Sequence, residues 1–220
     1  DTSAQQQTAR GDTGRAAANS RAAYRDLSTY DPGRLPCAVD LSDNTNLFGP
    51  APSVRTALTA MNDAVITRYP SVYADELRRA LAQLHGVEPA NIATGCGSDD
   101  VIDSTMRAFC DPADRVAYPD PTFGMIPSFA RMNAAAPVGI PLGPDFDIDV
   151  EGLLAERARL TYVCRPNNPT GTQFGRARIE RLCGEARGLV MIDEAYADFA
   201  DDDLVAFAVA SDGAVVLRTM

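Results

Sequence analysis

The sequence predicts an α/β fold in which helices cover both faces of a mostly parallel sheet. From about residue 50 onward, short apolar segments alternate with helical segments that begin and end at turn residues. The short segments are apolar throughout, as in strands that are buried on both faces. Alternation of such strands with helices favours parallel crossover units. We therefore expect three layers (helix, sheet, helix), with ligands at the carboxyl ends of the strands.

The predicted elements follow one another with short connections. Helices are expected at 52–61, 74–84, 99–109, 122–132, from about 150, and at 176–185, and strands at 116–118, 137–140, 160–164, 189–192 and 214–217. In the second helix, Leu77, Leu81 and Leu84 share one face and Gly86 follows as a stop signal. Residues 1 to about 30 have no apolar stripe and are expected to form an N-terminal arm.

Composition excludes several classes of function. A net charge of -10 disfavours binding to nucleic acid or to an anionic membrane, and no apolar run is long enough to span a bilayer. The only histidine, His85, cannot build a zinc site or a Ser-His-Asp triad by itself, so no metal is expected. The five cysteines form no CxxC pair, which favours a reducing, cytoplasmic location over a disulfide scaffold.

Candidate binding residues occupy two turns that follow or precede predicted elements. Gly97, Ser98 and Asp99 open a helix, so their backbone N–H groups can face an anion with the helix dipole behind them. The same residues also suit a simple helix cap. Phe123 follows the strand at 116–118, where its ring either stacks on a planar heterocycle or belongs to the core.

Two later turns carry a more specific signal. Asn168 lies in the turn Asn167-Asn168-Pro169-Thr170-Gly171, where its carboxamide can donate to a ring oxygen. Asp193 directly follows a buried strand, where an unpaired charge is costly, and a protonated pyridine nitrogen would be a suitable partner. Tyr196 is near enough to bind a hydroxyl of the same ring. Together these residues predict pyridoxal 5'-phosphate (PLP) as the cofactor.

A set of motifs runs from about residue 40 to the last residue. It consists of 41–50 (Leu-Ser-Asp-Asn-Thr-Asn-Leu-Phe-Gly-Pro), Arg68-Tyr69-Pro70, 95–100 (Gly-Cys-Gly-Ser-Asp-Asp), Pro121-Thr122-Phe123, 167–171, Asp193-Glu194-Ala195-Tyr196 and Leu217-Arg218-Thr219. As a set it resembles the histidinol-phosphate aminotransferase family, a branch of the fold-type-I PLP enzymes. The resemblance implies an N-terminal arm and small-domain segment over 1–50 and a PLP-binding large domain over 51–220.

The resemblance also implies partners and residue roles. It implies a homodimer with shared active sites that moves an amino group between an amino donor and a 2-oxo acid, with neither nucleic acid nor membrane as a partner. The cofactor-binding set that it implies is Gly97, Ser98, Asp99, Phe123, Asn168, Asp193, Tyr196 and Tyr69.

Within this set the resemblance gives each residue a part. The first three residues meet the phosphate, and Tyr69 reaches the phosphate of the neighbouring subunit. Phe123 stacks on the ring, Asn168 and Tyr196 contact its hydroxyl oxygen, and Asp193 pairs with its nitrogen. Asp193 and Tyr196 are the expected catalytic residues.

The resemblance also implies two residues that contact the substrate. Asn44 and Asn46 are implied on the substrate side, but 44–47 reads Asn-Thr-Asn-Leu where the family usually has Asn-Glu-Asn-Pro. Histidinol phosphate and an aromatic or specialised amino acid therefore both stay open as the amino substrate.

The chain contains no lysine, because all twenty basic residues are Arg. We therefore expect a longer polypeptide whose cofactor-linking lysine follows Met220. A decarboxylase resembling threonine-phosphate decarboxylase and a non-catalytic relative are the alternatives.

Overall fold

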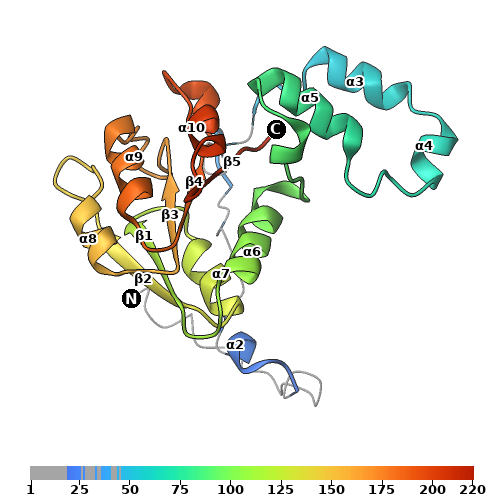
Figure 1. Ribbon diagram of the computed structural model, residues 1–220. Coiled ribbons are helices and arrows are strands. Elements are labelled where there is room, and N and C mark those ends of the chain that lie inside the picture. The colour runs from blue at the N-terminus through green and yellow to red at the C-terminus, as the bar shows by residue number, and fades with distance from the viewer. Residues whose placement is uncertain (1–18, 26, 28–32, 34–35, 41–43, 45) are drawn as a thin grey trace.

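The structure is a computed structural model that describes residues 19–25, 27, 33, 36–40, 44 and 46–220. Its centre is an all-parallel sheet of five strands in the order β2-β1-β3-β4-β5 (Figure 1). The strands are β1 (Arg115–Asp120), β2 (Ala136–Pro141), β3 (Leu160–Cys164), β4 (Leu189–Asp193) and β5 (Ala214–Leu217). The predicted α/β fold is confirmed, and β3 and β5 have the predicted bounds.

Most helices lie close to their predicted positions. They are α3 (Pro52–Thr59), α5 (Asp75–His85), α6 (Gly97–Phe109), α7 (Ile126–Met132), α8 (Val150–Ala155) and α9 (Arg176–Glu185). Gly86 ends α5 in the left-handed conformation, with φ of 66°. The helix expected from 122 begins only at Ile126, because the Thr122 hydroxyl is bound to Asn167 and Phe123 belongs to a turn.

Several short elements were not predicted from the sequence. They are α2 (Ala22–Arg25), α4 (Asp63–Thr67), α10 (Val205–Val209) and the 3-10 turns Pro89–Asn91 and Ala197–Phe199. Each spans too few residues to show a helical period. No helix in the described part of the chain combines the length and apolar character that a bilayer crossing requires.

Two apolar clusters on opposite faces of the sheet make the fold three-layered. One joins α8, α9 and α10 to inward side chains such as Val163 and Ile192. The other joins α6 and α7 to Tyr162, Cys164 and Met191. Alternate residues of β3 and β4 therefore enter different clusters, which explains why these strands are apolar throughout. α3, α4 and α5 extend to one side of this body (Figure 1).

Candidate active site

The strand order reverses between β1 and β3. From β1 the chain moves outward to β2 and then returns to β3 on the other side of β1. β1 and β3 pair only through Val116–Leu160 and Ala117–Thr161, whereas β1 and β2 pair along the whole of β1. The carboxyl ends of β1 and β3 are therefore not paired, and a reversal of this kind is where open α/β sheets bind ligands.

Asn167 bridges the loops that leave these two strands. Its Oδ1 accepts a hydrogen bond from the Thr122 hydroxyl at 2.8 Å, and its Nδ2 donates to the Pro121 carbonyl at 3.1 Å and to Thr170 Oγ1 at 3.0 Å. Asn167 is buried, so its amide is used within the protein. Asn168 is only half-buried and lines an adjacent cavity. The two asparagines thus have different surroundings.

Asp193 ends β4 as a buried carboxylate. Its Oδ2 accepts from the Tyr162 hydroxyl at 2.6 Å and its Oδ1 from the Ala195 N–H at 3.0 Å. Burial raises the pKa of Asp193, the two hydrogen bonds lower it, and the negative charge of Asp99 raises it further. Among the described residues Asp193 forms no ion pair, so the cationic partner expected from the sequence is not supplied by an arginine of this part of the chain.

Tyr196 and Asn44 meet beside a cavity of about 300 Å³. Asn44 Nδ2 donates to the Tyr196 hydroxyl at 2.8 Å. The cavity is lined by Asn44, Pro166, Asn167, Asn168, Pro169, Gly171, Tyr196 and Phe199. Three of the predicted site residues, Asn44, Asn168 and Tyr196, are therefore brought together, although they come from three separate segments.

The N-terminus of α6 has the backbone shape of an anion site. Gly97 begins the helix with φ of 84°, a conformation that favours glycine. The Cys96 N–H donates to Asp100 Oδ2 at 2.8 Å, while the N–H groups of the first helical turn have no acceptor inside the helix. Ser98 and Asp99 lie in this turn. α6 packs through Ile102 and Met106 on the face of the sheet that carries Met191, the face that Asp193 shares two residues later.

The remaining predicted residues have different positions. Phe123 packs against the apolar cluster that contains Tyr162, so its ring lies next to the site and also belongs to the core. Asn46 is used in a local turn, where it accepts from the Phe48 N–H and donates to the Gly49 carbonyl. Tyr69 is fully exposed beyond α4. The structure therefore does not bring Asn46 and Tyr69 to the cavity of this chain.

A buried charge network supports the residue next to Asp193. Arg165 donates to the Phe174 carbonyl at 2.7 Å and to Asp202 Oδ1 at 2.6 Å, and it lies 4.0 Å from Glu194 Oε1. Glu194 also accepts from the Leu204 N–H at 2.7 Å. Because Arg165 precedes the 167–171 turn and Glu194 follows Asp193, the network ties together the ends of β3 and β4.

Tyr162, Asn167 and Arg165 are the site residues that the sequence interpretation missed. The sequence places Tyr162 in a strand that is apolar throughout, which gives no sign that its hydroxyl has a charged partner. The contact depends on the register of β3 and β4, in which Cys164, on the same face as Tyr162, lies opposite Asp193. Arg165 stands out in retrospect as a charged residue directly after a buried strand, the same signal that identified Asp193.

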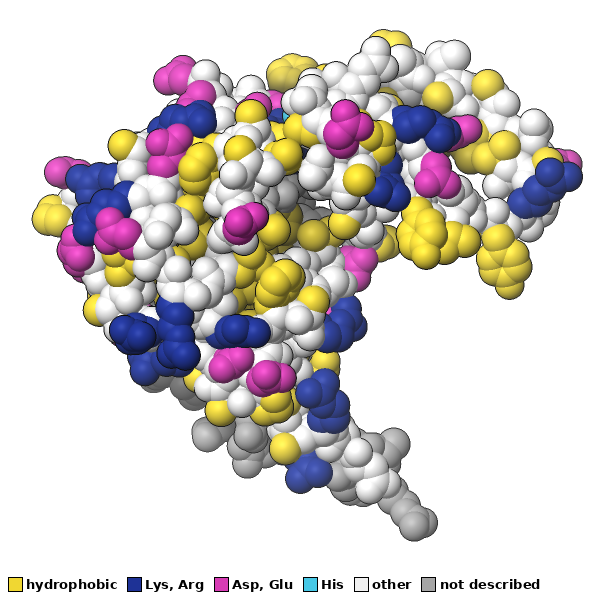
Figure 2. Space-filling model, in the orientation of Figure 1, with side chains coloured by type: hydrophobic (Ala, Val, Ile, Leu, Met, Phe, Trp, Pro, Cys, Tyr) yellow, Lys and Arg dark blue, Asp and Glu magenta, His cyan; other side chains and the backbone are white. Residues whose placement is uncertain are grey.

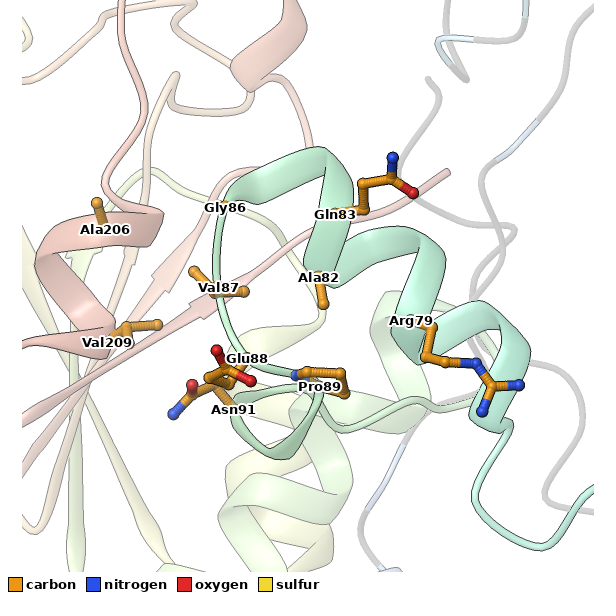
Figure 3. Close-up of a pocket in the computed structure, with 10 residues that line it drawn as sticks. All are labelled: Arg79, Ala82, Gln83, Gly86, Val87, Glu88, Pro89, Asn91, Ala206 and Val209. Carbon is orange, nitrogen blue, oxygen red and sulfur yellow. The ribbon is translucent and has the colours of Figure 1, made fainter.

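A larger cavity of about 560 Å³ lies elsewhere, between α5 and α10 (Figure 3). Arg79 and Gln83 come from α5, Glu88 and Asn91 from the following loop, and Val209 from α10. It contains none of the predicted site residues, and no residue lining it is a buried unpaired charge. The smaller cavity, which is lined by Asn44, Asn168 and Tyr196, is therefore the better candidate for the active site.

No cluster of metal-ligating side chains occurs among the residues that the structure describes.

The family follows from a comparison with known proteins. The model of the family "Aminotransferase class I and II" matches residues 37–220, and the chain belongs to this family. Fold and site agree with that membership, since the site residues lie at the carboxyl ends of parallel strands.

Individual relatives show which members of this family the chain is similar to. An aromatic amino acid aminotransferase from Rhodococcus erythropolis is 38% identical over 88% of this chain and 56% of its own length. A histidinol-phosphate aminotransferase from Ruegeria pomeroyi is 35% identical over 88% and 56%. The crystal structure of histidinol-phosphate aminotransferase from Sinorhizobium meliloti in complex with PLP superposes with a TM-score of 0.72 at 28% identity, covering 78% of this chain and 49% of that one. The predicted resemblance is confirmed, and the chain spans about half the length of these relatives.

Proposed function

We propose that this chain forms the PLP-binding part of an aminotransferase that moves an amino group between an amino donor and a 2-oxo acid. Asp193 is the observation that carries the proposal. It is a buried carboxylate with two hydrogen-bond donors and no cationic partner among the described residues. A protonated pyridine nitrogen completes a site of this kind. The proposal assigns cofactor binding to residues 51–220, and an arm with a small-domain segment to residues 1–50.

The chemistry of the surrounding residues fits PLP. The first turn of α6, with Gly97, Ser98 and Asp99, offers backbone N–H groups to the phosphate. Asn168 and Tyr196 line the cavity from which a ring hydroxyl can be bound, and Phe123 packs against the apolar cluster that contains Tyr162. The site thus offers donors for an anion at one end and a carboxylate for a cation at the other.

When bound, PLP supplies an electron sink for the negative charge that develops at the donor's Cα. Asp193 keeps a proton at the ring nitrogen, which strengthens that sink. Tyr196 and Asn168 orient the ring through its hydroxyl, and Phe123 fixes its plane. Proton transfer at Cα requires a base, a role that a lysine would fill. These 220 residues contain no lysine, so the proposal assigns the base to none of them.

The substrate side supports an aromatic or imidazole-bearing amino donor. Curated relatives at similar identity are named for aromatic amino acids and for histidinol phosphate. Asn44 lies against Tyr196 at the cavity, and Asn46 shapes the turn that follows it. The exposed Phe199 lines the same cavity and offers an apolar surface to such a side chain.

The test uses the protein produced from its complete reading frame. PLP is added, excess is removed, and absorbance is recorded before and after borohydride reduction, followed by amino-transfer assays with an aromatic amino acid and with histidinol phosphate. We expect a reducible band and amino transfer, both lost or strongly reduced in Asp193→Asn and retained in Asp212→Asn, an exposed control. Release of CO₂ without a keto product would support the decarboxylase alternative. Absence of any reducible band would support the non-catalytic relative and refute the proposal.

A homodimer is the second part of the proposal. α3 and α4 contain no buried residue, and the segment from α3 to the start of α5 exposes Val54, Leu58, Met61, Val65, Ile66, Tyr69, Val72 and Tyr73. Figure 2 shows hydrophobic side chains gathered on this projecting part of the molecule. An apolar surface of this extent is characteristic of an interface. We propose that a second copy covers it and that Tyr69 there reaches the partner's cofactor phosphate.

Mixed dimers test the shared site. Tyr69→Phe and Asp193→Asn are each expected to reduce activity, and mixing the two variants should restore part of it, because one site of the mixed dimer is then intact. If the mixed protein has the mass of a dimer but recovers no activity, the proposal of shared active sites is refuted.

We also propose a cytoplasmic location for this protein. The five cysteines of these residues are free thiols, as is usual for proteins of a reducing compartment.

A further inference from the structure

Tyr162 is a buried polar side chain that the proposed reaction does not use. It is fully buried, and its hydroxyl lies 2.6 Å from Asp193 Oδ2. That distance is in the range of a hydrogen bond to a charged oxygen, which is shorter and stronger than a neutral one. In the described residues it is the only side chain that donates to Asp193; the other donor is the backbone N–H of Ala195.

The sheet register produces this contact. β3 and β4 run parallel, with Tyr162 opposite Met191 and Cys164 opposite Asp193. Side chains two residues apart on a strand share a face, so Tyr162 reaches diagonally along the sheet toward Asp193. Its ring packs within the cluster of α6, α7 and Met191. The hydroxyl therefore has a fixed position relative to the carboxylate.

Protonation states around Asp193 make Tyr162 a permanent donor. Burial and the charge of Asp193 raise the pKa of Tyr162 well above its usual value, so the phenol keeps its proton. The other titratable groups that act here are Cys164 on β3, whose pKa burial raises to about 12, and Asp99 on α6. Neither supplies a positive charge. The hydrogen bond from Tyr162 is thus a main interaction that favours the ionised form of Asp193 against burial.

We propose that Tyr162 is a positioning residue that orients Asp193 and lowers its proton affinity, so that the proton shared with a bound pyridine ring stays on the ring nitrogen. This inference rests on the proposed function. The proton can lie on the ring nitrogen, beside a carboxylate, or on Asp193, beside a neutral ring. Donation from Tyr162 stabilises the carboxylate, and so favours the protonated ring, which is the better electron sink.

Tyr162→Phe removes the hydroxyl and retains the ring. Tyr118→Phe is the matched control, because Tyr118 packs against the same cluster and makes no hydrogen bond to Asp193. The protein from the complete reading frame is first measured without PLP, by NMR titration of isotopically labelled aspartate carboxyls, with the Asp193 signal assigned by its loss in Asp193→Asn. We expect Tyr162→Phe to raise the proton affinity of Asp193 about ten- to a hundredfold, and Tyr118→Phe to leave it unchanged.

The second measurement uses PLP labelled at the ring nitrogen. In Tyr162→Phe the nitrogen chemical shift should move toward that of neutral pyridine, and in Tyr118→Phe it should stay at the wild-type position. Unchanged values for both measurements in Tyr162→Phe, or equal changes in the two variants, would overturn the inference. If Tyr162→Phe does not fold, the wild-type Tyr162 ring-carbon signal decides: it should respond to the titration of Asp193, and an unresponsive signal would overturn the inference.

Failure of the proposed function is separable from failure of this inference. A wild-type protein that binds no PLP refutes the function, while the titration without PLP still measures the effect of Tyr162 on Asp193. A protein that binds PLP but shows no dependence of the ring nitrogen on Tyr162 retains the function and loses the inference.

Discussion

Asn44 and Tyr196 are 152 positions apart in the chain, and the Asn44 amide donates to the Tyr196 hydroxyl at 2.8 Å. Asn44 adopts a positive φ of 56°, which asparagine tolerates better than most residues. The contact joins the segment before α3 to the turn after β4, and both residues line the candidate cavity. A residue outside the sheet thus positions a side chain at the sheet's edge.

Asn44→Ala should reduce activity and lower stability slightly. Asn44 is exposed, but its positive φ is less favourable for alanine, so the free energy of unfolding should fall by about 1 kcal/mol. Loss of one hydrogen bond to Tyr196 should lower kcat/KM about two- to tenfold. Denaturant unfolding and amino-transfer kinetics measure the two effects. Asn19→Ala, at an exposed position, is the control, and an equal loss of activity in both variants would contradict the prediction.

Asp193→Asn should stabilise the protein in the absence of cofactor. The folded-state pKa of Asp193 is raised, so its contribution to stability is present below the unfolded-state pKa and is lost as pH rises through the folded-state value. At neutral pH the buried carboxylate therefore costs stability. We expect a higher Tm for the variant near pH 7.5, by about 2–4 °C for each kcal/mol relieved, and a smaller difference toward pH 4.

Thermal unfolding over this pH range measures the effect. Asp212→Asn, at an exposed position, should not change Tm at any of these pH values. A lower Tm for Asp193→Asn at neutral pH would show that the hydrogen bonds from Tyr162 and Ala195 outweigh the burial of the charge.

Arg165→Met should be strongly destabilising. It removes the 2.6 Å bond to Asp202 and one of the two cations beside buried Glu194, which keeps only Arg218 at 3.4 Å, so we expect a loss of about 3 kcal/mol, at the low end for a buried pair that loses one partner. Arg178→Met breaks an exposed pair with Asp147 at 3.1 Å and should cost less than about 1 kcal/mol. Denaturant unfolding compares them. Adding Glu194→Gln to Arg165→Met should recover part of the loss, and no recovery would argue against an unpaired charge as its cause.

Two of the five thiols should react readily. Cys37 and Cys96 are exposed, whereas burial raises the pKa of Cys110 and Cys183 to about 11 and that of Cys164 to about 12. The thiolate is the reactive form, so the three latter residues should resist a thiol reagent at pH 8. Labelling with a thiol reagent followed by peptide mass spectrometry should find Cys37 and Cys96 modified quickly in the folded protein, and all five of these cysteines modified in denaturant. Rapid labelling of Cys110, Cys164 or Cys183 in the folded protein would contradict this.

Local patterns in the sequence were sufficient for the five strands, for the longer helices and for part of the site. The apolar runs of β3 and β4 identified buried parallel strands, because only such strands have apolar residues on both faces. The carboxylate of Asp193 was recognisable because a charge directly after a buried strand needs a partner. The short helices α4 and α10 were not recognisable, since a single turn has no period.

Tertiary structure alone decided which side chains meet. The sequence determined that Asp193, Asn168 and Tyr196 follow strands, but the strand order β2-β1-β3-β4-β5 brought Thr122 to Asn167 and Tyr162 to Asp193. It also placed Asn44 against Tyr196 and left Tyr69 exposed. The physical reason is that spacing along the chain specifies a residue's face on its own strand or helix, whereas contacts between strands depend on register and on the order in which the strands are packed.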